Sequence, residues 1–351
     1  MASNREISIR VEHTPGQLEL LLGKLISNDI KYAVMMHGPA GVGKSSIVGQ
    51  VARGNEIEMI DVRLSQLAPT DLRGLPVPDS ELSISRWFPP EFLPRDPKSR
   101  GILFLDEINM AGPTMQGIAQ QLILDRKVGS YVVPEGWFIW AAGNRKEDRA
   151  TVFEMPAPLA NRFLHYDVKA DVESWKAWAL DSGQVDEEVL AFVSYRPELL
   201  HKLEQRQPAW PSPRTWTMAN TLYKAGFNIA PAVGDAAANE FQAYISVYKD
   251  LPNLDAIADG QGAQFRFPSS NPGAQYAVAI GLVTRMVDPK TIGNSLEWLA
   301  ERAPSEWTQM SLADLTAKLT RQGQMSKLLA VMAQRPKLAG FMALYRDIMK
   351  S

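Results

Sequence analysis

The chain contains no cysteine, which excludes disulfide bonds, thiolate nucleophiles and cysteine-ligated zinc sites. Histidine is scarce as well. The four histidines are too scattered along the sequence to predict a metal site, and we expect each of them to be an ordinary surface or core residue. They are His13, His37, His165 and His201.

A strong net charge and long apolar runs are also missing. The formal net charge is −2 and the pI is near 6.2, so no global basic field favours nucleic acid and we expect none as a partner. No stretch approaches the roughly 20 apolar residues of a membrane span, and residues 1–6 lack an apolar signal segment. We therefore expect a cytoplasmic protein without a membrane span. Its 351 residues suffice for about two domains.

The most specific motif present is G-x-x-x-x-G-K-[ST] at residues 38–45, between an apolar run at 32–36 and a helical pattern at 45–52. In such a loop the backbone N–H groups point at phosphate oxygens, and the following helix adds the positive end of its dipole. We expect Lys44 to reach the β- and γ-phosphates and Ser45 to ligate Mg²⁺. A glycine-rich turn without a ligand is the alternative. The predicted nucleotide-binding residues are Gly38, Pro39, Ala40, Gly41, Val42, Gly43, Lys44, Ser45 and Ser46.

Two adjacent carboxylates, Asp106 and Glu107, follow the apolar run 102–105. Such a run is typical of a buried parallel strand whose carboxyl end faces a ligand crevice. We expect Asp106 to hold Mg²⁺ through its water shell and Glu107 to orient or deprotonate the attacking water. Alone, the two acids could simply end a strand in solvent. Together with the phosphate-binding loop they predict hydrolysis of a nucleoside triphosphate.

The first half of the chain alternates between strand and helix patterns. A capping box at 14–17 opens a helix through Ile26, and further strands are predicted at 56–62 and 136–142. Strands separated by helices predict a mainly parallel α/β sheet covered on both faces. From about Val172 the pattern becomes helical, which marks a second part of the chain.

Two segments between the predicted strands are expected to be irregular inserts. Residues 71–94 are rich in proline and aromatic residues, and residues 125–134 have the pattern of a hairpin that turns near Gly129. Aromatic side chains in this region could grip a peptide or an adaptor, or they could pack against their own domain. They are Trp87, Phe88, Phe92, Tyr131 and Trp137.

The helical half has proline-rich breaks at 208–213 and 268–272. Beyond residue 234 apolar residues recur at helical spacing, which predicts a packed helical extension. They are Leu312, Leu315, Leu319, Leu328, Leu329, Met332, Phe341, Leu344, Tyr345 and Ile348.

Taken in order, the motifs resemble the MoxR and dynein-related group of AAA+ ATPases over roughly residues 15–230. They are the phosphate-binding loop, Asp106-Glu107-Ile108-Asn109, Ala142-Gly143-Asn144, Leu159-Ala160-Asn161-Arg162-Phe163 and Pro211-Ser212-Pro213-Arg214. The loop alone is generic, whereas the later motifs in this order are specific. The resemblance implies a P-loop AAA+ α/β core over 1–170 and an α-helical lid over 171–233. Beyond this range the resemblance fades, and the helical spacing predicts a helical C-terminal extension over 234–351. A single set of motifs implies one ATPase module per chain.

The resemblance also assigns roles to three polar residues. Asn144 is similar to the sensor 1 residue that positions the lytic water, although a strand-end asparagine can also simply make a turn. Arg162 is similar to the arginine finger that reaches the γ-phosphate of a neighbouring subunit, with a surface ion-pair residue as the alternative. Arg214 follows a good N-cap and first helical residue, Ser212 and Pro213, and resembles sensor 2 acting in cis. A plain helix-surface arginine is its alternative.

The function implied by the resemblance is that of a Mg²⁺-dependent ATPase forming a homo-oligomeric ring, expected to be hexameric. It would remodel or activate a protein client, as a chaperone does, with a partner that carries a von Willebrand A-type domain. Two alternatives stay open. One is a nucleic-acid-directed motor of the McrB or helicase-loader kind, which the near-neutral charge disfavours. The other is a slow, nucleotide-gated assembly scaffold. No guanine-specific Asn-Lys-x-Asp motif is present, so ATP is favoured over GTP.

Overall fold

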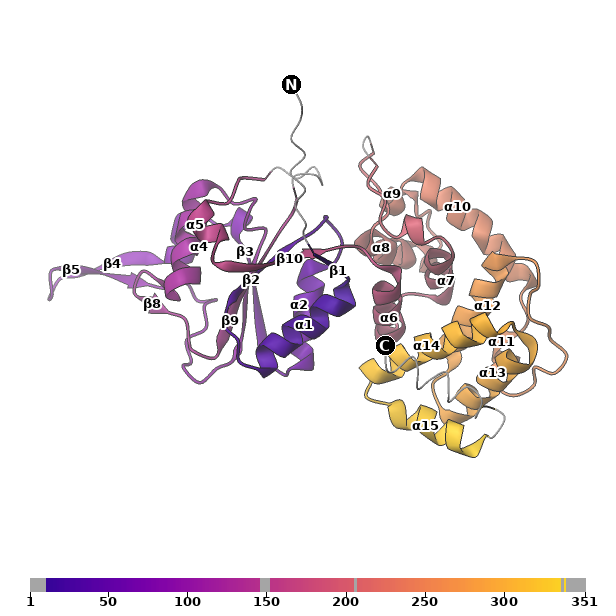
Figure 1. Ribbon diagram of the computed structural model, residues 1–351. Coiled ribbons are helices and arrows are strands. Elements are labelled where there is room, and N and C mark those ends of the chain that lie inside the picture. Colours follow the sequence, from indigo (N-terminus) through magenta and orange to yellow (C-terminus); the bar gives the residue numbers. More distant parts are fainter. Residues whose placement is uncertain (1–10, 146–151, 205–206, 336–337, 339–351) are drawn as a thin grey trace, which may run out of the picture. The chain divides into compact units, whose positions relative to one another are not determined.

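The computed structural model describes residues 11–145, 152–204, 207–335 and 338. They form two compact units that divide between Ala170 and Asp171 (Figure 1). The first unit is α/β and the second is helical, so the fold class predicted from the sequence is confirmed. The finer division of the helical half at residues 233 and 234 stays a prediction.

The first unit is built on a six-stranded parallel sheet with the order β1-β10-β2-β9-β6-β3. The central strands are almost wholly buried, as apolar runs in a parallel sheet covered on both faces should be. The four predicted strands are confirmed as β2, β3, β6 and β9, with ends that differ by one or two residues, whereas β1 and β10 were not predicted. The strands are β1 (Glu12–His13), β2 (Ala33–His37), β3 (Glu58–Arg63), β6 (Gly101–Asp106), β9 (Trp137–Gly143) and β10 (Phe163–Val168).

Helices cover both faces of this sheet (Figure 1). On one face α1 (Pro15–Ser27) and α2 (Lys44–Gly54) pack apolar side chains against alternate residues of β2, β6 and β9. On the other face α4 (Pro113–Asp125) and α5 (Ala157–Ala160) do the same. The capping box predicted for α1 is confirmed, because the side chains and backbone N–H groups of Thr14 and Gln17 bond reciprocally.

The prediction that residues 71–94 are irregular was wrong for most of the segment. A 3-10 turn (Leu64–Gln66) and the short helix α3 (Pro69–Arg73) lead into an antiparallel hairpin of β4 (Leu75–Asp79) and β5 (Ile84–Phe88), which extends away from the main sheet (Figure 1). Pro76 and Pro78 fit because they occupy alternate positions of β4. Their missing N–H groups therefore lie on the side of the strand that has no partner.

The second predicted hairpin is confirmed. Strands β7 (Lys127–Val128) and β8 (Tyr131–Val132) pair antiparallel, and the turn uses the left-handed backbone of Gly129. The two hairpins touch, because Ser130 Oγ donates a hydrogen bond of 2.7 Å to the carbonyl of Trp87.

The aromatic side chains of this region differ in exposure. Trp137 is fully buried and its Nε1 donates to Ser99 Oγ, while the hydroxyl of buried Tyr131 donates to the carbonyl of Pro94. The hypothesis that these two rings grip a client is therefore wrong. They pack within the unit because both have apolar neighbours and a satisfied polar tip. Phe92 is also partly buried in this core, Trp87 is half-buried under the Arg73 guanidinium, and Phe88 is 58% exposed.

The second unit contains only helices and turns among its described residues. The predicted proline breaks are confirmed, since α8 and α12 begin at Pro213 and Pro272. The helices are α6 (Val172–Ser182), α7 (Glu187–Tyr195), α8 (Pro213–Lys224), α9 (Ala230–Val233), α10 (Asp235–Ile245), α11 (Leu254–Ala258), α12 (Pro272–Arg285), α13 (Pro289–Arg302), α14 (Ser305–Arg321) and α15 (Met325–Gln334), with 3-10 turns at Pro197–Leu199 and Ser246–Asp250.

The apolar spacing predicted for the end of the chain matches α14 and α15. Most of these side chains are buried, but Leu329 is 50% exposed. The buried ones are Leu312, Leu315, Leu319, Leu328 and Met332. The last four predicted positions, Phe341, Leu344, Tyr345 and Ile348, lie outside the described residues.

A buried ion pair joins α6 to α14. Lys176 Nζ lies 2.8 Å from Asp314 Oδ1, and the two side chains are only 2% and 5% exposed. Glu173, which is largely exposed, offers Lys176 a second carboxylate. Burial raises the pKa of Asp314 to about 6 in spite of the neighbouring ammonium group. The cost of desolvating the Asp314 carboxylate is therefore larger than the electrostatic stabilisation that the Lys176 cation gives it.

Replacing Lys176 by methionine should destabilise the second unit by about 3–5 kcal/mol, because Asp314 would stay buried without its cation. The loss should be larger at pH 8 than at pH 5. Folded Asp314 has a raised pKa, so its contribution to stability rises as the pH falls from about 6 toward the ordinary value of 3.8. Urea unfolding followed by tryptophan fluorescence at both pH values measures the effect.

The matched control is the double variant Lys176→Met, Asp314→Leu, which removes both charges and keeps apolar volume. It should be close to the unsubstituted protein in stability. If it is as unstable as Lys176→Met alone, lost packing rather than an unpaired charge explains the effect.

Candidate nucleotide-binding site

Three strand ends place the predicted site residues at one edge of the sheet. Strand β2 leads into the glycine-rich loop, its neighbour β9 ends beside Asn144, and the next strand, β6, ends at Asp106. Because the strands are parallel, their carboxyl ends meet at the same edge, which is where open α/β sheets bind ligands. The loop, the two carboxylates and Asn144 are thus brought together from separate parts of the sequence.

The glycines are required by the shape of the loop. Gly41 and Gly43 have φ angles of +79° and +98°, in the left-handed region that glycine tolerates best. A Cβ atom on Gly38 would lie 2.7 Å from the carbonyl oxygen of Val168, so the loop also passes too close to β10 for a larger residue. Gly43 is the N-cap of α2, which leaves the first N–H groups of an 11-residue helix facing the loop.

Lys44 lies inside this loop with only 9% of its surface exposed. Its ammonium group donates to the carbonyls of Gly38 and Pro39 at 2.7 and 3.2 Å and to Asn144 Oδ1 at 3.0 Å. The cation is therefore held between the loop and the end of β9. An ammonium group and a ring of backbone N–H groups fit the phosphates of a nucleotide, whose oxygens would compete with these acceptors.

The oxygen ligands expected around Mg²⁺ are also adjacent. Ser45 Oγ donates to Asp106 Oδ2 at 2.9 Å, and the backbone N–H of Glu107 donates to the other Asp106 oxygen at 2.9 Å. Within the described residues, no group of three or more histidine or acidic side chains could hold a metal unaided. Mg²⁺ commonly takes one or two protein oxygens and completes its shell with water and phosphate, and Ser45 and Asp106 could supply such oxygens.

Glu107 has two features that the sequence did not reveal. Its φ angle is +56°, which is uncommon for a residue with a side chain, and Ser65 donates a hydrogen bond to its Oε2. Nearby on β3, burial and the charges of Asp106 and Glu107 raise the pKa of Asp61, although Arg63 opposes them. The edge of the sheet therefore carries concentrated negative charge that a divalent cation would relieve.

Asn109 is a site residue whose role its place in the Asp-Glu-Ile-Asn motif does not reveal. Its Nδ2 donates to the carbonyl of Asn144 at 2.6 Å, and the backbone N–H of Asn144 donates back to Asn109 Oδ1 at 3.2 Å. The side chain thus pairs with the Asn144 backbone as a neighbouring strand would. Asn109 is buried and lies so close to Gly143 that a Cβ there would be 2.4 Å from its Oδ1. In the sequence, the only signal for Asn109 is its position in the motif Asp-Glu-Ile-Asn.

Replacing Asn109 by alanine should lower the ATPase kcat by about 10- to 100-fold, since a displacement of about 1 Å at a reacting group can cost that much. ATP affinity should change little, because the contacts of Lys44 with the loop stay intact. Steady-state kinetics and binding of a fluorescent ATP analogue separate the two effects. The matched control is Asn28→Ala, which removes an asparagine from the end of α1. Equal losses of kcat and affinity would contradict a role in positioning Asn144.

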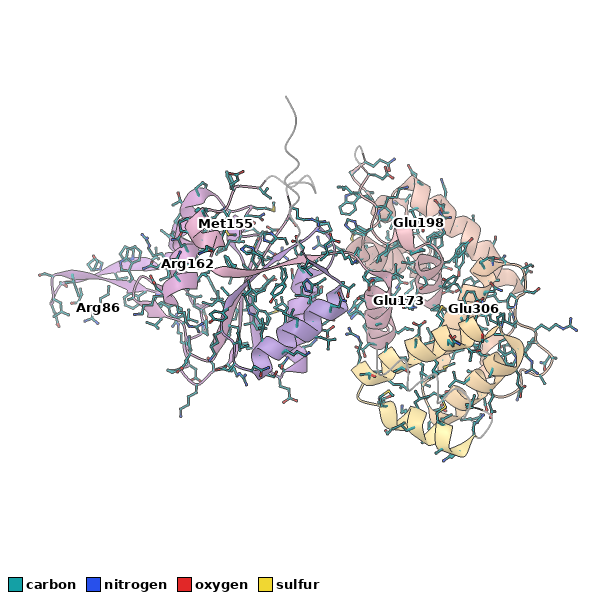
Figure 2. All side chains as sticks on the ribbon, in the orientation of Figure 1. Arg86, Met155, Arg162, Glu173, Glu198 and Glu306 are labelled. Carbon is teal, nitrogen blue, oxygen red and sulfur yellow. The ribbon has the colours of Figure 1, made fainter. Side chains whose placement is uncertain are left out.

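Arg162 lies at the opposite edge of the sheet from the loop. It directly precedes Phe163, which pairs with Ala33, the first residue of β2, whereas Gly38 follows the last residue of that strand. The side chain is exposed beside α5 (Figure 2), and its Nη1 donates to the carbonyl of Pro158 at 2.5 Å. The structure therefore does not bring Arg162 to the loop of its own chain.

Arg214 belongs to the second unit. It is the second residue of α8, after the N-cap Ser212 and Pro213, and its side chain is exposed. The predicted helix start is confirmed, and the structure adds a capping box between Ser212 and Thr215. The predicted roles of Asn144, Arg162 and Arg214 stay predictions.

Two histidines that are scattered in the sequence meet in the fold. His37 and His165 are far apart in the sequence, but β2 and β10 are neighbouring strands, and His37 Nε2 lies 3.0 Å from His165 Nδ1. Their rings stack with an interplanar angle of 13°. Within the described residues the two histidines belong to no group of three or more side chains that could hold a metal.

No helix in the described part of the chain has the length and apolar character needed to span a membrane.

The glycine loop, the buried lysine and the serine–aspartate pair on a parallel sheet define a P-loop module that binds a nucleoside triphosphate. Residues 33–163 match the sequence profile of the AAA domain of the dynein-related subfamily. The chain therefore contains an AAA domain of this subfamily over residues 33–163, as the motifs predicted.

Solved structures with some likeness include the RuvB Holliday junction branch migration motor of Thermotoga maritima. It is 15% identical, with 71% of this chain and 74% of that chain covered and a TM-score of 0.39. A protein of Cytophaga hutchinsonii described provisionally as an ATPase is 12% identical, with 84% and 79% covered and a TM-score of 0.32. No curated protein matches the chain by sequence.

Proposed function

We propose that the protein is a cytoplasmic, MoxR-like, ring-forming ATPase whose active site is completed by the neighbouring subunit. One chain supplies the loop, Asp106, Glu107 and Asn144, and the next supplies Arg162. Mg²⁺, when bound with ATP, would be held through Ser45 and Asp106 and would neutralise phosphate charge. Glu107 would accept the proton of the attacking water. Residues 171–233 would form the lid that carries Arg214, and residues 234–351 its extension.

The position of Arg162 carries this proposal. The loop and Arg162 are separated by the length of β2, roughly 16 Å at 3.3 Å per residue. That span is beyond the reach of one side chain, so Arg162 cannot serve the loop of its own chain without unfolding β10. An exposed arginine at this edge can instead serve a second copy, and a ring gives every copy the same neighbour.

Single-particle images recorded with and without ATP test the ring. With the slowly hydrolysing variant Glu107→Gln and ATP, we expect closed rings, which are expected to be hexameric. Without nucleotide we expect smaller species. A strictly monomeric protein that hydrolyses ATP at full rate would contradict the proposal, because no partner could then supply Arg162.

We further propose that the client is a protein, reached through the β4–β5 hairpin. One face of this hairpin carries exposed apolar side chains that the pairing places together: Leu75 across from Phe88, with Val77 and Ile84 further along. They are 42% to 62% exposed. The prolines of β4 block strand addition at its open edge, so contact would be made by side chains. Such surfaces suit apolar segments of proteins better than a phosphate backbone.

The double variant Leu75→Ser, Ile84→Ser should lose stimulation of the ATPase by a purified von Willebrand A-domain partner or an unfolded protein. Basal ATPase should stay within about twofold, because surface substitutions away from the site rarely disturb the fold. The same assay with single-stranded and duplex DNA tests the nucleic-acid alternative. Stimulation by DNA alone, unaffected by the double variant, would contradict a protein client. Leu20→Ser on exposed α1 is the control for lost surface hydrophobicity.

A further inference from the structure

We infer that His165 is a positioning residue for Arg162, and that His37 orients His165 from the end of the strand that leads into the nucleotide loop. The inference rests on the proposed role of Arg162 in the neighbouring site. It explains how one chain could connect the two edges of its sheet, one holding its own nucleotide and the other facing the next subunit.

The contacts run along the sheet in two steps. His37 is the last residue of β2 and directly precedes Gly38, whose carbonyl accepts a hydrogen bond from Lys44. Its Nε2 lies 3.0 Å from Nδ1 of His165, on the neighbouring strand β10. His165 Nε2 in turn lies 2.7 Å from the carbonyl oxygen of Ala160. The pair thus reaches back from the carboxyl edge toward the amino edge of the sheet.

The carbonyl of Ala160 belongs to the turn that carries Arg162. Ala160 is the last residue of α5, where carbonyl groups lack intrahelical partners. The N–H of Arg162 itself bonds to the carbonyl of Leu159, so the turn is short and tightly connected. Fixing the Ala160 carbonyl therefore limits how this turn, and the guanidinium on it, can rotate. Phe163, buried below the turn, packs edge-on against the His165 ring and limits its rotation too.

The protons of the pair follow from the acceptor at its end. A carbonyl oxygen can only accept, so His165 Nε2 must carry a proton. In a neutral His165, Nδ1 is then the acceptor, and His37 Nε2 must donate to it. When both rings are neutral, each histidine has the one tautomer that its neighbour selects. The two rings also stack on each other. Stacking limits their rotation, which suits an orienting role.

A subunit-mixing experiment separates this role from others. His165→Ala should lower the turnover of the pure protein by about 10- to 100-fold through a misplaced finger. Its nucleotide loop should stay competent. Mixed with Lys44→Ala chains, which offer a normal finger, His165→Ala chains should therefore recover turnover. Mixed with Arg162→Ala chains, which need a finger from their neighbour, they should recover little.

The reverse pattern would overturn the inference, because it would place the defect in the loop. Recovery with neither partner, or unchanged turnover of His165→Ala, would overturn it as well. The mixture of Lys44→Ala with Arg162→Ala reports on the proposed function alone. If that mixture stays inactive, the shared site itself is wrong; if it recovers and the His165 pattern fails, only the inference is wrong.

Two conservative variants, each with a side-chain amide at position 165, test whether the residue acts through its hydrogen bond to the Ala160 carbonyl. The amide N–H of His165→Gln can replace the Nε2 donor to Ala160, whereas the shorter amide of His165→Asn lies near the Nδ1 position and does not reach the Ala160 carbonyl. Glutamine should therefore retain several-fold more turnover than asparagine, with equal ATP affinity for both. His201→Asn in the second unit is the control and should match the unsubstituted protein. Equal loss in the two His165 variants would contradict a role through Ala160.

Discussion

Glutamine in place of Glu107 should reduce ATP hydrolysis by about 10²- to 10⁴-fold, the usual contribution of a general base. The amide has the same shape but cannot accept the proton of the attacking water. ATP should still bind, because Lys44 keeps its contact with the loop carbonyl of Gly38 and Ser45 keeps its hydrogen bond to Asp106. The variant should therefore accumulate bound ATP. Phosphate release and retention of radiolabelled ATP on the protein measure the two properties.

The matched control is Glu58→Gln, an exposed carboxylate on β3 of the same sheet. It should leave hydrolysis unchanged. Continued hydrolysis by Glu107→Gln would mean that another group activates the water. If hydrolysis stops while assembly and client activation persist, the protein is better described as a nucleotide-gated scaffold.

Removal of the Arg162 side chain should have an even larger effect. An arginine finger supplied by a neighbour contributes about 10³ to 10⁵ in rate, because it neutralises charge that develops in the transition state. Arg162→Ala should therefore be almost inactive while binding ATP normally through its intact loop. Lys44→Ala should be inactive for the opposite reason, since it lacks the cation of the loop but keeps its finger.

Mixing the two inactive proteins should restore part of the activity. At every interface where an Arg162→Ala chain offers its loop to the finger of a Lys44→Ala chain, both missing groups are present. Turnover measured across mixing ratios should be greatest near equal amounts. Absence of recovery in rings confirmed by particle images would contradict a finger acting between chains. The control for loss of an arginine is Arg100→Ala. The Arg100 guanidinium donates a hydrogen bond to the carbonyl of Ile26 near the end of α1.

Local sequence signals proved reliable where neighbouring residues decide the structure. The capping box at Thr14, the glycines of the loop and the start of α8 at Pro213 depend on interactions within a few residues, and all are confirmed. The prediction for residues 71–94 failed because prolines were read as breakers. Their tolerance in β4 depends on which edge of the strand has a partner, and that is a property of the hairpin.

The site shows the same division. The sequence motifs predicted the site residues Lys44, Ser45, Asp106, Glu107 and Asn144. They could not show that Asn109 pairs with the backbone of Asn144, or that Ser65 donates a hydrogen bond to Glu107. These contacts join residues from different strands. The sequence did not show which aromatic side chains are buried either. Trp137 is fully buried, whereas Phe88 is 58% exposed.

The sequence by itself determined that this chain has an AAA+ nucleotide-binding module, because phosphate binding needs a short run of glycines, a lysine and a serine at fixed spacing. Only the tertiary structure decided where the remaining groups lie. The order of strands in a parallel sheet placed Asn144 beside Lys44, brought His37 to His165, and put Arg162 at the far edge. Strand order depends on packing across the whole unit, and no short stretch of residues contains it.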